Sequence, residues 1–243
     1  MQRRSHRYGE DMPRFMQGAI PSPNIWNTPH IYELENRAVD PDGLADAAMA
    51  AIRPWDGATV LDIGCGSGYH LPSLSATAAR VIGVEPHGDL VELARRRCRP
   101  LPDVEVHAAT AQALPLPDAS VDVAVARWAY FFGPGCEPGL AELSRVVRRG
   151  GAAFVIDLDA TRGAFGRWFS QSVPTHSARS VEEFWSRQGW QSRPLDLRMS
   201  FERRADLEAV LRIEFSPAIA DRAIAETPGL ELAYPNLLRW KLY

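Results

Sequence analysis

The residues best suited to chemistry in this chain are three glycines and an acid. Gly64, Gly66 and Gly68 follow the apolar run 60–63, and Glu85 ends a second apolar run. Glycine allows a sharp turn with positive φ and lets the backbone approach a ligand without an intervening Cβ. An acid about twenty residues beyond such a turn can accept hydrogen bonds from two ribose hydroxyls. The pattern therefore predicts a site for a nucleoside-containing ligand.

The glycine spacing separates two ligand classes. Dinucleotide folds use G-x-G-x-x-G, which requires a glycine where this chain has Tyr69. A pyrophosphate also needs close approach to a helix N-terminus and room for two phosphates. The third glycine comes one position earlier here, at Gly68, so a nicotinamide oxidoreductase is disfavoured.

The stretch 60–68 together with Glu85 resembles motif I of the class I methyltransferases, which bind S-adenosylmethionine, a ligand without phosphate. The resemblance covers roughly residues 59–158 and implies S-adenosylmethionine as the cofactor. It implies these cofactor contacts on the first two strands and their turns: Asp62, Gly64, Cys65, Gly66, Gly68, Glu85 and Pro86.

A third segment, 109–118, is similar to the loop that holds the adenine in that family. The family places an acid where this chain has Thr110, and the backbone amide of the next residue, Ala111, makes the second contact. A threonine hydroxyl accepts the same hydrogen bond more weakly than a carboxylate does. Gln112 is the alternative adenine contact.

A fourth segment, 122–151, is similar to the family's fourth strand and the helix end after it, with Arg149 in place of the usual proline. Arg127 and Trp128 then stand at the carboxyl end of that strand, where open α/β sheets bind ligands. Core packing is the alternative role for Trp128.

Methyl transfer from a sulfonium mainly requires an aligned nucleophile. An oxygen acceptor also needs a general base, whereas a neutral amine or a stabilised carbanion often does not. We predict His30 as that base, because histidine titrates near neutrality, and Tyr130 as a second catalytic residue. Tyr32 is expected to contact the cofactor. The alternative for each candidate is a wall residue, and the same holds for Glu33, Cys136 and Glu137.

Aromatic residues on the same segments predict an apolar pocket for a small organic acceptor; they are Trp26, Tyr32, Trp128, Tyr130, Phe131 and Phe132. Single-stranded RNA also stacks on aromatic rings, but it requires a basic groove as well. A further aromatic helix, around Phe165, Trp168 and Phe169, either covers this pocket or packs on its own core.

The elements that position these residues alternate between strand and helix. Apolar runs predict strands at 59–63, 80–84, 104–108, 121–125 and 152–158, with helices at 68–79, 87–98 and 137–149 between them. Two further strands are expected near 195–201 and 237–242. We predict an α/β fold: a doubly wound, mostly parallel seven-stranded sheet, with helices on both faces and an antiparallel last strand.

Residues 1–39 are predicted to form an N-terminal lid over the active site. Prolines interrupt any long element there, yet the segment carries more aromatic residues than a disordered tail. A segment packed permanently on the surface is the alternative. Residues 40–243 are expected to form a single methyltransferase domain, with a cofactor half at 59–158 and an acceptor side with a C-terminal hairpin at 159–243.

The composition of the chain argues against several classes of function. The chain has 243 residues, 27 basic residues and a formal net charge of −3, so no nucleic-acid partner is expected. Lys241 is the one lysine, which excludes a P-loop and a Schiff-base enzyme. The arginine cluster at 95–99 is interpreted as complementing a helix dipole rather than as an RNA patch.

The three cysteines and six histidines are scattered, so no metal site is expected. No window approaches a membrane span, and no apolar segment follows the basic start, so a cytoplasmic protein is expected.

These observations predict an S-adenosylmethionine-dependent methyltransferase acting on a small organic molecule, with secondary metabolism as the expected setting. Two alternatives keep the fold and the cofactor: an enzyme of cyclisation or elimination, and a catalytically silent subunit. An RNA methyltransferase is a further alternative, disfavoured by the charge. The sequence leaves open the methylated atom and the oligomeric state.

Overall fold

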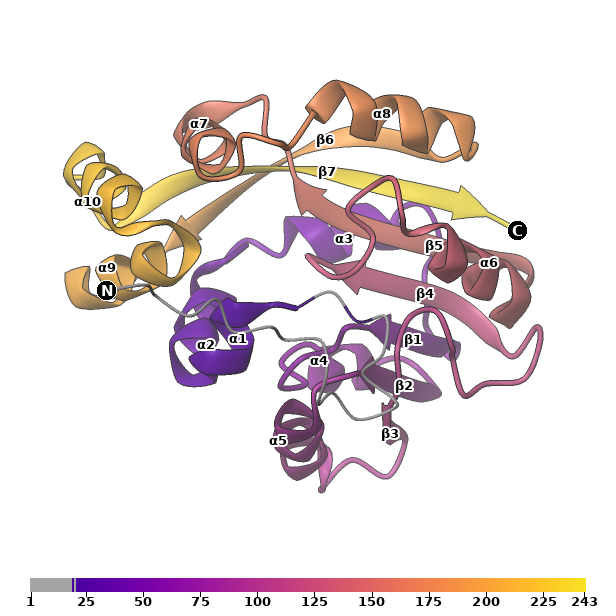
Figure 1. The fold of residues 1–243 in the computed structure, drawn as a ribbon. Coiled ribbons are helices and arrows are strands. Elements are labelled where there is room, and N and C mark those ends of the chain that lie inside the picture. The colour runs from indigo at the N-terminus through magenta and orange to yellow at the C-terminus, as the bar shows by residue number, and fades with distance from the viewer. Residues whose placement is uncertain (1–18, 20) are drawn as a thin grey trace, which may run out of the picture.

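A seven-stranded sheet forms the centre of the computed structural model, which describes Ala19 and residues 21–243 (Figure 1). In sheet order, the strands run β3-β2-β1-β4-β5-β7-β6. Their bounds are β1 (Thr59–Ile63), β2 (Arg80–Glu85), β3 (Val104–Ala108), β4 (Val121–Arg127), β5 (Val147–Leu158), β6 (Gln191–Ser200) and β7 (Glu231–Leu242). The helices are α1 (Pro23–Asn27), α2 (Pro29–Ala38), α3 (Leu44–Ala50), α4 (Leu71–Ser75), α5 (Gly88–Cys98), α6 (Glu137–Val146), α7 (Gly163–Ser172), α8 (Ala178–Arg187), α9 (Arg204–Glu214) and α10 (Pro217–Glu226).

The strand pairing confirms the predicted fold class. β1 pairs in parallel with β2 and β4, and the parallel pairing continues to β3 on one side and to β5 on the other. β7 pairs antiparallel with both β5 and β6. The last two strands are neighbours, as predicted, but α9 and α10 lie between them in the chain, so they do not form a tight hairpin.

The central strands are buried on both faces, which is why they appear in the sequence as continuous apolar runs. Val60 and Val123 are register partners that join the core on one face of the sheet. Their successors, Leu61 and Ala124, are also register partners and join the core on the other face. The period-two alternation of the strand sends consecutive side chains to opposite faces.

Several element bounds differ from the predicted ones. The helix after the glycine turn is short, since α4 begins only at Leu71 and ends at Ser75. The helix expected to reach residue 149 ends at Val146, and β5 starts at Val147. The last strand is twice as long as predicted because it follows β6 along its full length.

The prolines of the lead-in begin helices rather than preventing them. Pro23 and Pro29 stand at the first positions of α1 and α2, where the fixed φ suits a helix and the missing N–H costs nothing. α2 packs on α9 and on β6. In Figure 1, α1 and α2 lie between α9 and the region of α4 and α5. The N-terminal 18 residues and residue 20, which belong to the predicted lid, lie outside the described part.

Within the described residues, no helix has the length and apolar character needed to cross a bilayer.

Candidate functional site

A cavity of about 1070 Å³, open mouth included, lies at the carboxyl ends of β1, β2 and β4. Open α/β sheets bind their ligands at this edge, outside the carboxyl ends of the strands. Most of the residues predicted for the site line it: Tyr32, Asp62, Gly64, Cys65, Gly66, Glu85, Pro86, Thr110, Ala111, Gln112, Arg127, Trp128 and Tyr130. Gly68 and His30 do not.

The glycine turn has the positive φ angles that its sequence predicts. They are +74° at Gly64, +55° at Gly66 and +76° at Gly68. A Cβ on Gly64 would lie 2.4 Å from the Cβ of Ala129, and one on Gly68 would lie 2.9 Å from the Cβ of Ala94. Gly68 therefore allows the turn to pack against α5 and does not face the cavity, which corrects its prediction as a ligand contact.

Glu85 is held in place by two backbone amides. Its Oε2 accepts a hydrogen bond from the N–H of Gly66 at 3.1 Å, and its Oε1 accepts one from the N–H of His87 at 2.9 Å. Burial raises the pKa of Glu85 to about 7, against the lowering effect of those two bonds. His87 precedes α5, so Glu85 both lines the cavity and supports the start of that helix.

The charged side chains of Asp62 and Arg127 lie at the carboxyl ends of β1 and β4. Arg127, whose side chain is 4% exposed, donates from Nη2 to Asp46 Oδ1 on α3 at 2.6 Å. Its Nη1 is buried and has no hydrogen-bond partner among the described residues. Burial raises the pKa of Asp62 to about 6, although the Arg127 cation lowers it. The cavity thus contains the buried carboxyl group of Asp62 and the Arg127 guanidinium, whose Nη1 has no hydrogen-bond partner among the described residues.

His70 also lines the cavity, although no pattern in the sequence pointed to it. Burial lowers its pKa well below the usual value, and the cations of Arg127 and Arg97 act in the same direction. The ring is therefore neutral at neutral pH. It follows the glycine turn at the start of a short helix, where neither periodicity nor a motif distinguishes it.

The loop after β3 closes another side of the cavity. The N–H of Ala109 donates to the backbone oxygen of Glu85 at 3.2 Å, which ties this loop to the end of β2. Thr110 and Ala111 are buried, and both line the cavity together with Gln112. The structure thus brings the predicted adenine contacts next to the acid predicted for the ribose.

An aromatic wall faces these polar groups. Five of the six predicted rings line the cavity: Trp26, Tyr32, Trp128, Tyr130 and Phe132. Phe131 is fully buried in the core instead. Trp128 and Tyr130 have φ of +49° and +51°, angles that are uncommon for residues other than glycine and that cluster at functional sites.

The predicted catalytic residues have different positions. Tyr130 lines the cavity, and burial raises the pKa of its phenol, so the hydroxyl is neutral. His30 lies instead in a second, separate depression beside Glu33 and Arg97. The structure therefore does not support His30 as the general base. His30 lies on the same helix as Tyr32, which lines the cavity, but His30 itself does not.

Other candidates also lie away from the cavity. Cys136 is buried in the core and Glu137 begins α6, and neither lines the cavity. Phe165 and Trp168 of α7 are buried and pack around Phe215. This helix packs on its own core rather than covering the pocket.

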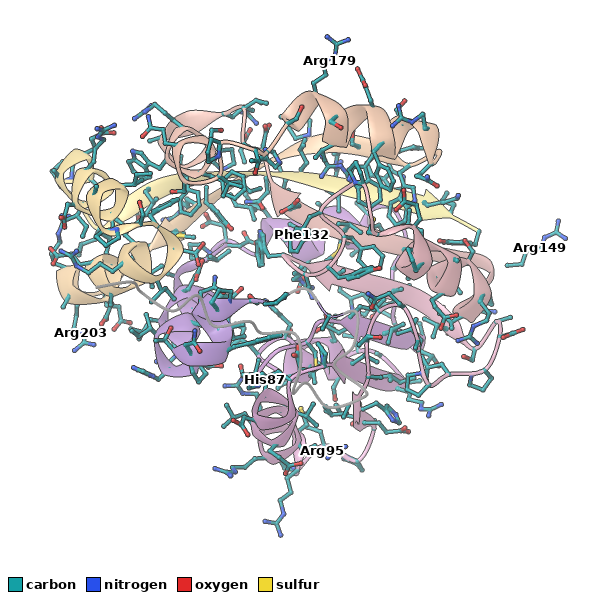
Figure 2. All side chains as sticks on the ribbon, in the orientation of Figure 1. His87, Arg95, Phe132, Arg149, Arg179 and Arg203 are labelled. Carbon is teal, nitrogen blue, oxygen red and sulfur yellow. The ribbon has the colours of Figure 1, made fainter. Side chains whose placement is uncertain are left out.

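The described part of the lead-in lies over the glycine turn at the edge of the cavity. A Cβ on Gly66 would lie 2.8 Å from the Cδ1 of Ile25. The Trp26 ring is 5.0 Å from that of His87, with the planes 32° apart. Figure 2 shows His87 at the end of α5 nearest to the lead-in helices. α1 therefore rests directly on the glycine turn and on the start of α5.

Comparison with known proteins matches residues 61–155 to a family described as "Methyltransferase domain". The chain is 30% identical over 117 residues to a ubiquinone biosynthesis O-methyltransferase of Brucella anthropi, over 48% of this chain and 47% of that protein. It is also 30% identical over 127 residues to the cypemycin N-terminal methyltransferase of a Streptomyces species, over 51% of each. The chain spans about half the length of the curated relatives that it matches.

Solved structures share the fold over most of the chain. A SAM-dependent methyltransferase from Aquifex aeolicus superposes with a TM-score of 0.56 at 18% identity, covering 88% of this chain and 98% of the other. The [4+2]-cyclase SpnF gives a TM-score of 0.56 at 21% identity, covering 83% and 81%. At such identities the likeness shows the fold alone.

Proposed function

The chain belongs to the class I S-adenosylmethionine-dependent methyltransferases, and from this premise we propose that it transfers a methyl group from S-adenosylmethionine to a small organic acceptor. One observation carries the proposal. A single cavity combines the glycine turn, the buried acid at the end of β2 and the loop after β3 with an aromatic wall. The first three resemble a nucleoside site, and the wall offers a neighbouring apolar space for an acceptor.

The residues present fit the cofactor. Two hydrogen bonds from backbone amides hold the Glu85 carboxylate at the cavity, where it would accept hydrogen bonds from ribose hydroxyls. Thr110, Ala111 and Gln112 would surround the adenine. Asp62 and the free Nη1 of Arg127 would pair with the ammonium and carboxylate of the methionine end. When bound, the cofactor supplies a methyl group already activated by its positively charged sulfur.

The protein's own part in this reaction is alignment and the exclusion of water. The aromatic wall would hold an acceptor against the cofactor side of the cavity, and this positioning removes much of the entropic barrier. Polar groups at the wall are few, with Ser22, Tyr32 and Asn36 from the lead-in. Tyr130 from the loop after β4 contributes its ring to the wall, since its hydroxyl is buried from solvent.

For the methylated atom, we propose only the class of acceptor. The two relatives are named for transfer to oxygen and to an N-terminal group. His30 lies outside the cavity, and burial lowers the pKa of His70, which lines it, so that its ring is a weak base. An acceptor that reacts without a strong general base therefore fits this site best. An amine or a stabilised carbanion meets that requirement, and secondary metabolism, in the cytoplasm, is the setting that we propose.

We also propose that residues 1–39 act as a cover for a single domain formed by residues 40–243. In support, α1 and α2 supply cavity residues and rest on the glycine turn.

The test is an untargeted labelling experiment. Purified protein is incubated with S-adenosylmethionine carrying an isotopically labelled methyl group and with a small-molecule cell extract. We expect labelled product and S-adenosylhomocysteine in equal amounts, and neither in the Glu85→Ala variant. Glu92→Ala, on the exposed side of α5, is the matched control. Conversion of a small molecule into an isomer without S-adenosylhomocysteine would favour cyclisation, and label found in RNA would overturn the small-molecule proposal.

A further inference from the structure

Glu33 on α2 is shared between the glycine turn and α5. Its Oε1 accepts a hydrogen bond from the Oγ of Ser67, the residue between Gly66 and Gly68. Its Oε2 pairs with Nη2 of Arg97 at 2.7 Å. The Glu33 side chain is only 16% exposed, so water screens this ion pair less than it screens one on the open surface.

Arg97 completes a closed triangle of contacts. Its Nη1 donates to the backbone oxygen of Ser67 at 3.0 Å and to the Ser67 Oγ at 3.1 Å. Its guanidinium also lies 5.7 Å from the centre of the Tyr69 ring. The arginine cluster at 95–99 therefore includes a residue that does more than complement a helix dipole. Arg97 and Glu33 together hold α2 to the glycine turn.

The same lead-in segment is tied to the other half of the molecule. Asn24 Nδ2 donates to Glu214 Oε1 on α9 at 2.6 Å. α2 packs along α9, so α1 and α2 connect α9 to the glycine turn and the start of α5 (Figure 1). Ile25 and Trp26 line the cavity together with Glu85, so a nucleoside bound at Glu85 would lie next to these two residues of α1.

We propose that Glu33 is a latch that keeps α1 and α2 closed over the bound cofactor, so that cofactor release requires its contacts with Ser67 and Arg97 to break. This inference rests on the proposed function, since it concerns the same cavity. Glu33 acts through the glycine turn and touches no reacting atom, so it is a positioning residue. Packing on α9 remains when the latch opens and would serve as the pivot.

The latch is tested by the rate at which S-adenosylhomocysteine leaves the protein, measured by stopped-flow displacement. Glu33→Ala loses charge-assisted hydrogen bonds to both Ser67 and Arg97, so it should release the ligand at least about tenfold faster. Glu33→Gln keeps an acceptor for Ser67 but loses the ion pair, and we expect an intermediate rate. The double variant Glu33→Ala/Arg97→Ala should release no faster than the product of the two single effects, because both remove one shared contact.

Arg95→Ala is the matched control. Arg95 lies on the same helix, pairs with Glu92 at 2.9 Å and donates to the backbone oxygen of Val106 on β3, so it shares no contact with Glu33 or Ser67 (Figure 2). Its loss should leave the release rate unchanged. Hydrogen exchange on the full-length protein supplies a second readout. Amides in 23–38 should exchange faster in Glu33→Ala than in wild type or Arg95→Ala, while those of β4 should not change.

The outcomes are distinct. A wild-type protein that does not bind S-adenosylhomocysteine would overturn the proposed function, and the latch with it. Binding by the wild type with the same release rate in Glu33→Ala, Glu33→Gln and Arg97→Ala would overturn the latch alone. If Glu33→Ala does not fold, Glu33→Gln and Arg97→Ala carry the same comparison.

Discussion

Trp128 donates its indole Nε1–H to Oδ1 of Asn236 across 2.7 Å. This bond joins the loop after β4 to β7, two strands away in the sheet. Asn236 is fully buried, and its Nδ2 donates in turn to the backbone oxygen of Tyr234 at 2.8 Å. A left-handed φ in a residue other than glycine costs about 1–2 kcal/mol. The amide of Asn236 therefore helps to hold the Trp128 ring at the cavity wall against this local cost.

Replacing Asn236 tests this support. Asn236→Ala leaves the Trp128 N–H and the Tyr234 carbonyl without a side-chain partner, and each buried unpaired group costs about 1–3 kcal/mol. We expect the free energy of unfolding, measured with urea, to fall by about 2–4 kcal/mol. Gln191→Ala, at the exposed start of β6, should change it by less than about 0.5 kcal/mol. An equal loss in both variants would contradict a specific role for this amide.

The affinity for S-adenosylhomocysteine should depend on pH through Glu85. Its pKa is raised to about 7 by burial, so half of the free protein carries a neutral Glu85 near neutrality. Ribose hydroxyls donate best to the carboxylate, so affinity should rise as pH increases from 6 to 8, by about tenfold. Calorimetry across this range measures it. Glu85→Gln should bind the ligand more weakly, and its affinity should lose the part of the pH dependence that is due to Glu85. An unchanged dependence of affinity on pH would show that another group titrates.

The same pKa shifts have a consequence for the ligand-free protein. Glu85 and Asp62 both titrate higher in the folded state than in the unfolded chain, at about 7 and about 6. The unfolded chain therefore loses its protons first as pH rises. The contribution of these groups to stability is complete below pH 4 and decreases as pH rises to about 7. Urea titrations at pH 5 and 7 should show a smaller decrease in a Glu85→Gln variant than in wild type.

Arg127 should distinguish ligands with and without the methionine end. Its free Nη1 is proposed to pair with the cofactor carboxylate, an interaction that 5′-methylthioadenosine cannot make. Arg127→Ala should weaken binding of S-adenosylhomocysteine by at least about tenfold, since bonds to charged groups are worth about 1.5–3 kcal/mol. Binding of 5′-methylthioadenosine should change far less. Equal losses for both ligands would show that Arg127 acts only through the structure around Asp46.

Substitutions at Gly64 and Gly66 should distinguish two roles of the glycine turn, its packing in the fold and its contact with the ligand. Gly64→Ala places a Cβ 2.4 Å from that of Ala129 at a φ of +74°, so we expect loss of stability as well as of binding. At Gly66 a Cβ would meet the flexible end of Ile25. Gly66→Ala should therefore weaken cofactor binding with a smaller drop in the melting temperature than Gly64→Ala causes. The reverse order of stabilities would contradict this arrangement.

Much of the fold could be predicted because its signals are local. Continuous apolar runs identify strands buried on both faces, and the spacing from the glycine turn to Glu85 follows from one β-α-β unit. The loop at 109–118 was singled out by its resemblance to the family's adenine loop, and Thr110, Ala111 and Gln112 of this loop line the cavity.

The remainder depends on contacts between distant segments. His30 and Tyr32 are two residues apart, and only the packing of α2 on α9 decides which of them faces the cavity. Asn236 reaches Trp128 from 108 residues away. No periodicity marks such a partner, and the same holds for Asp46 beside Arg127.

The strand order also determines when the sheet can be completed. β6 has β7 as its one neighbour within the described chain, and β7 lies between β5 and β6. During synthesis, β1 to β5 can pair as soon as they emerge, since N-terminal parts of a chain fold first. β6 must wait until residues 231–242 arrive, and until then one edge of β5 is open to pairing with other chains. Ribosome-bound intermediates that end before residue 231 are thus the form of this protein most exposed to aggregation.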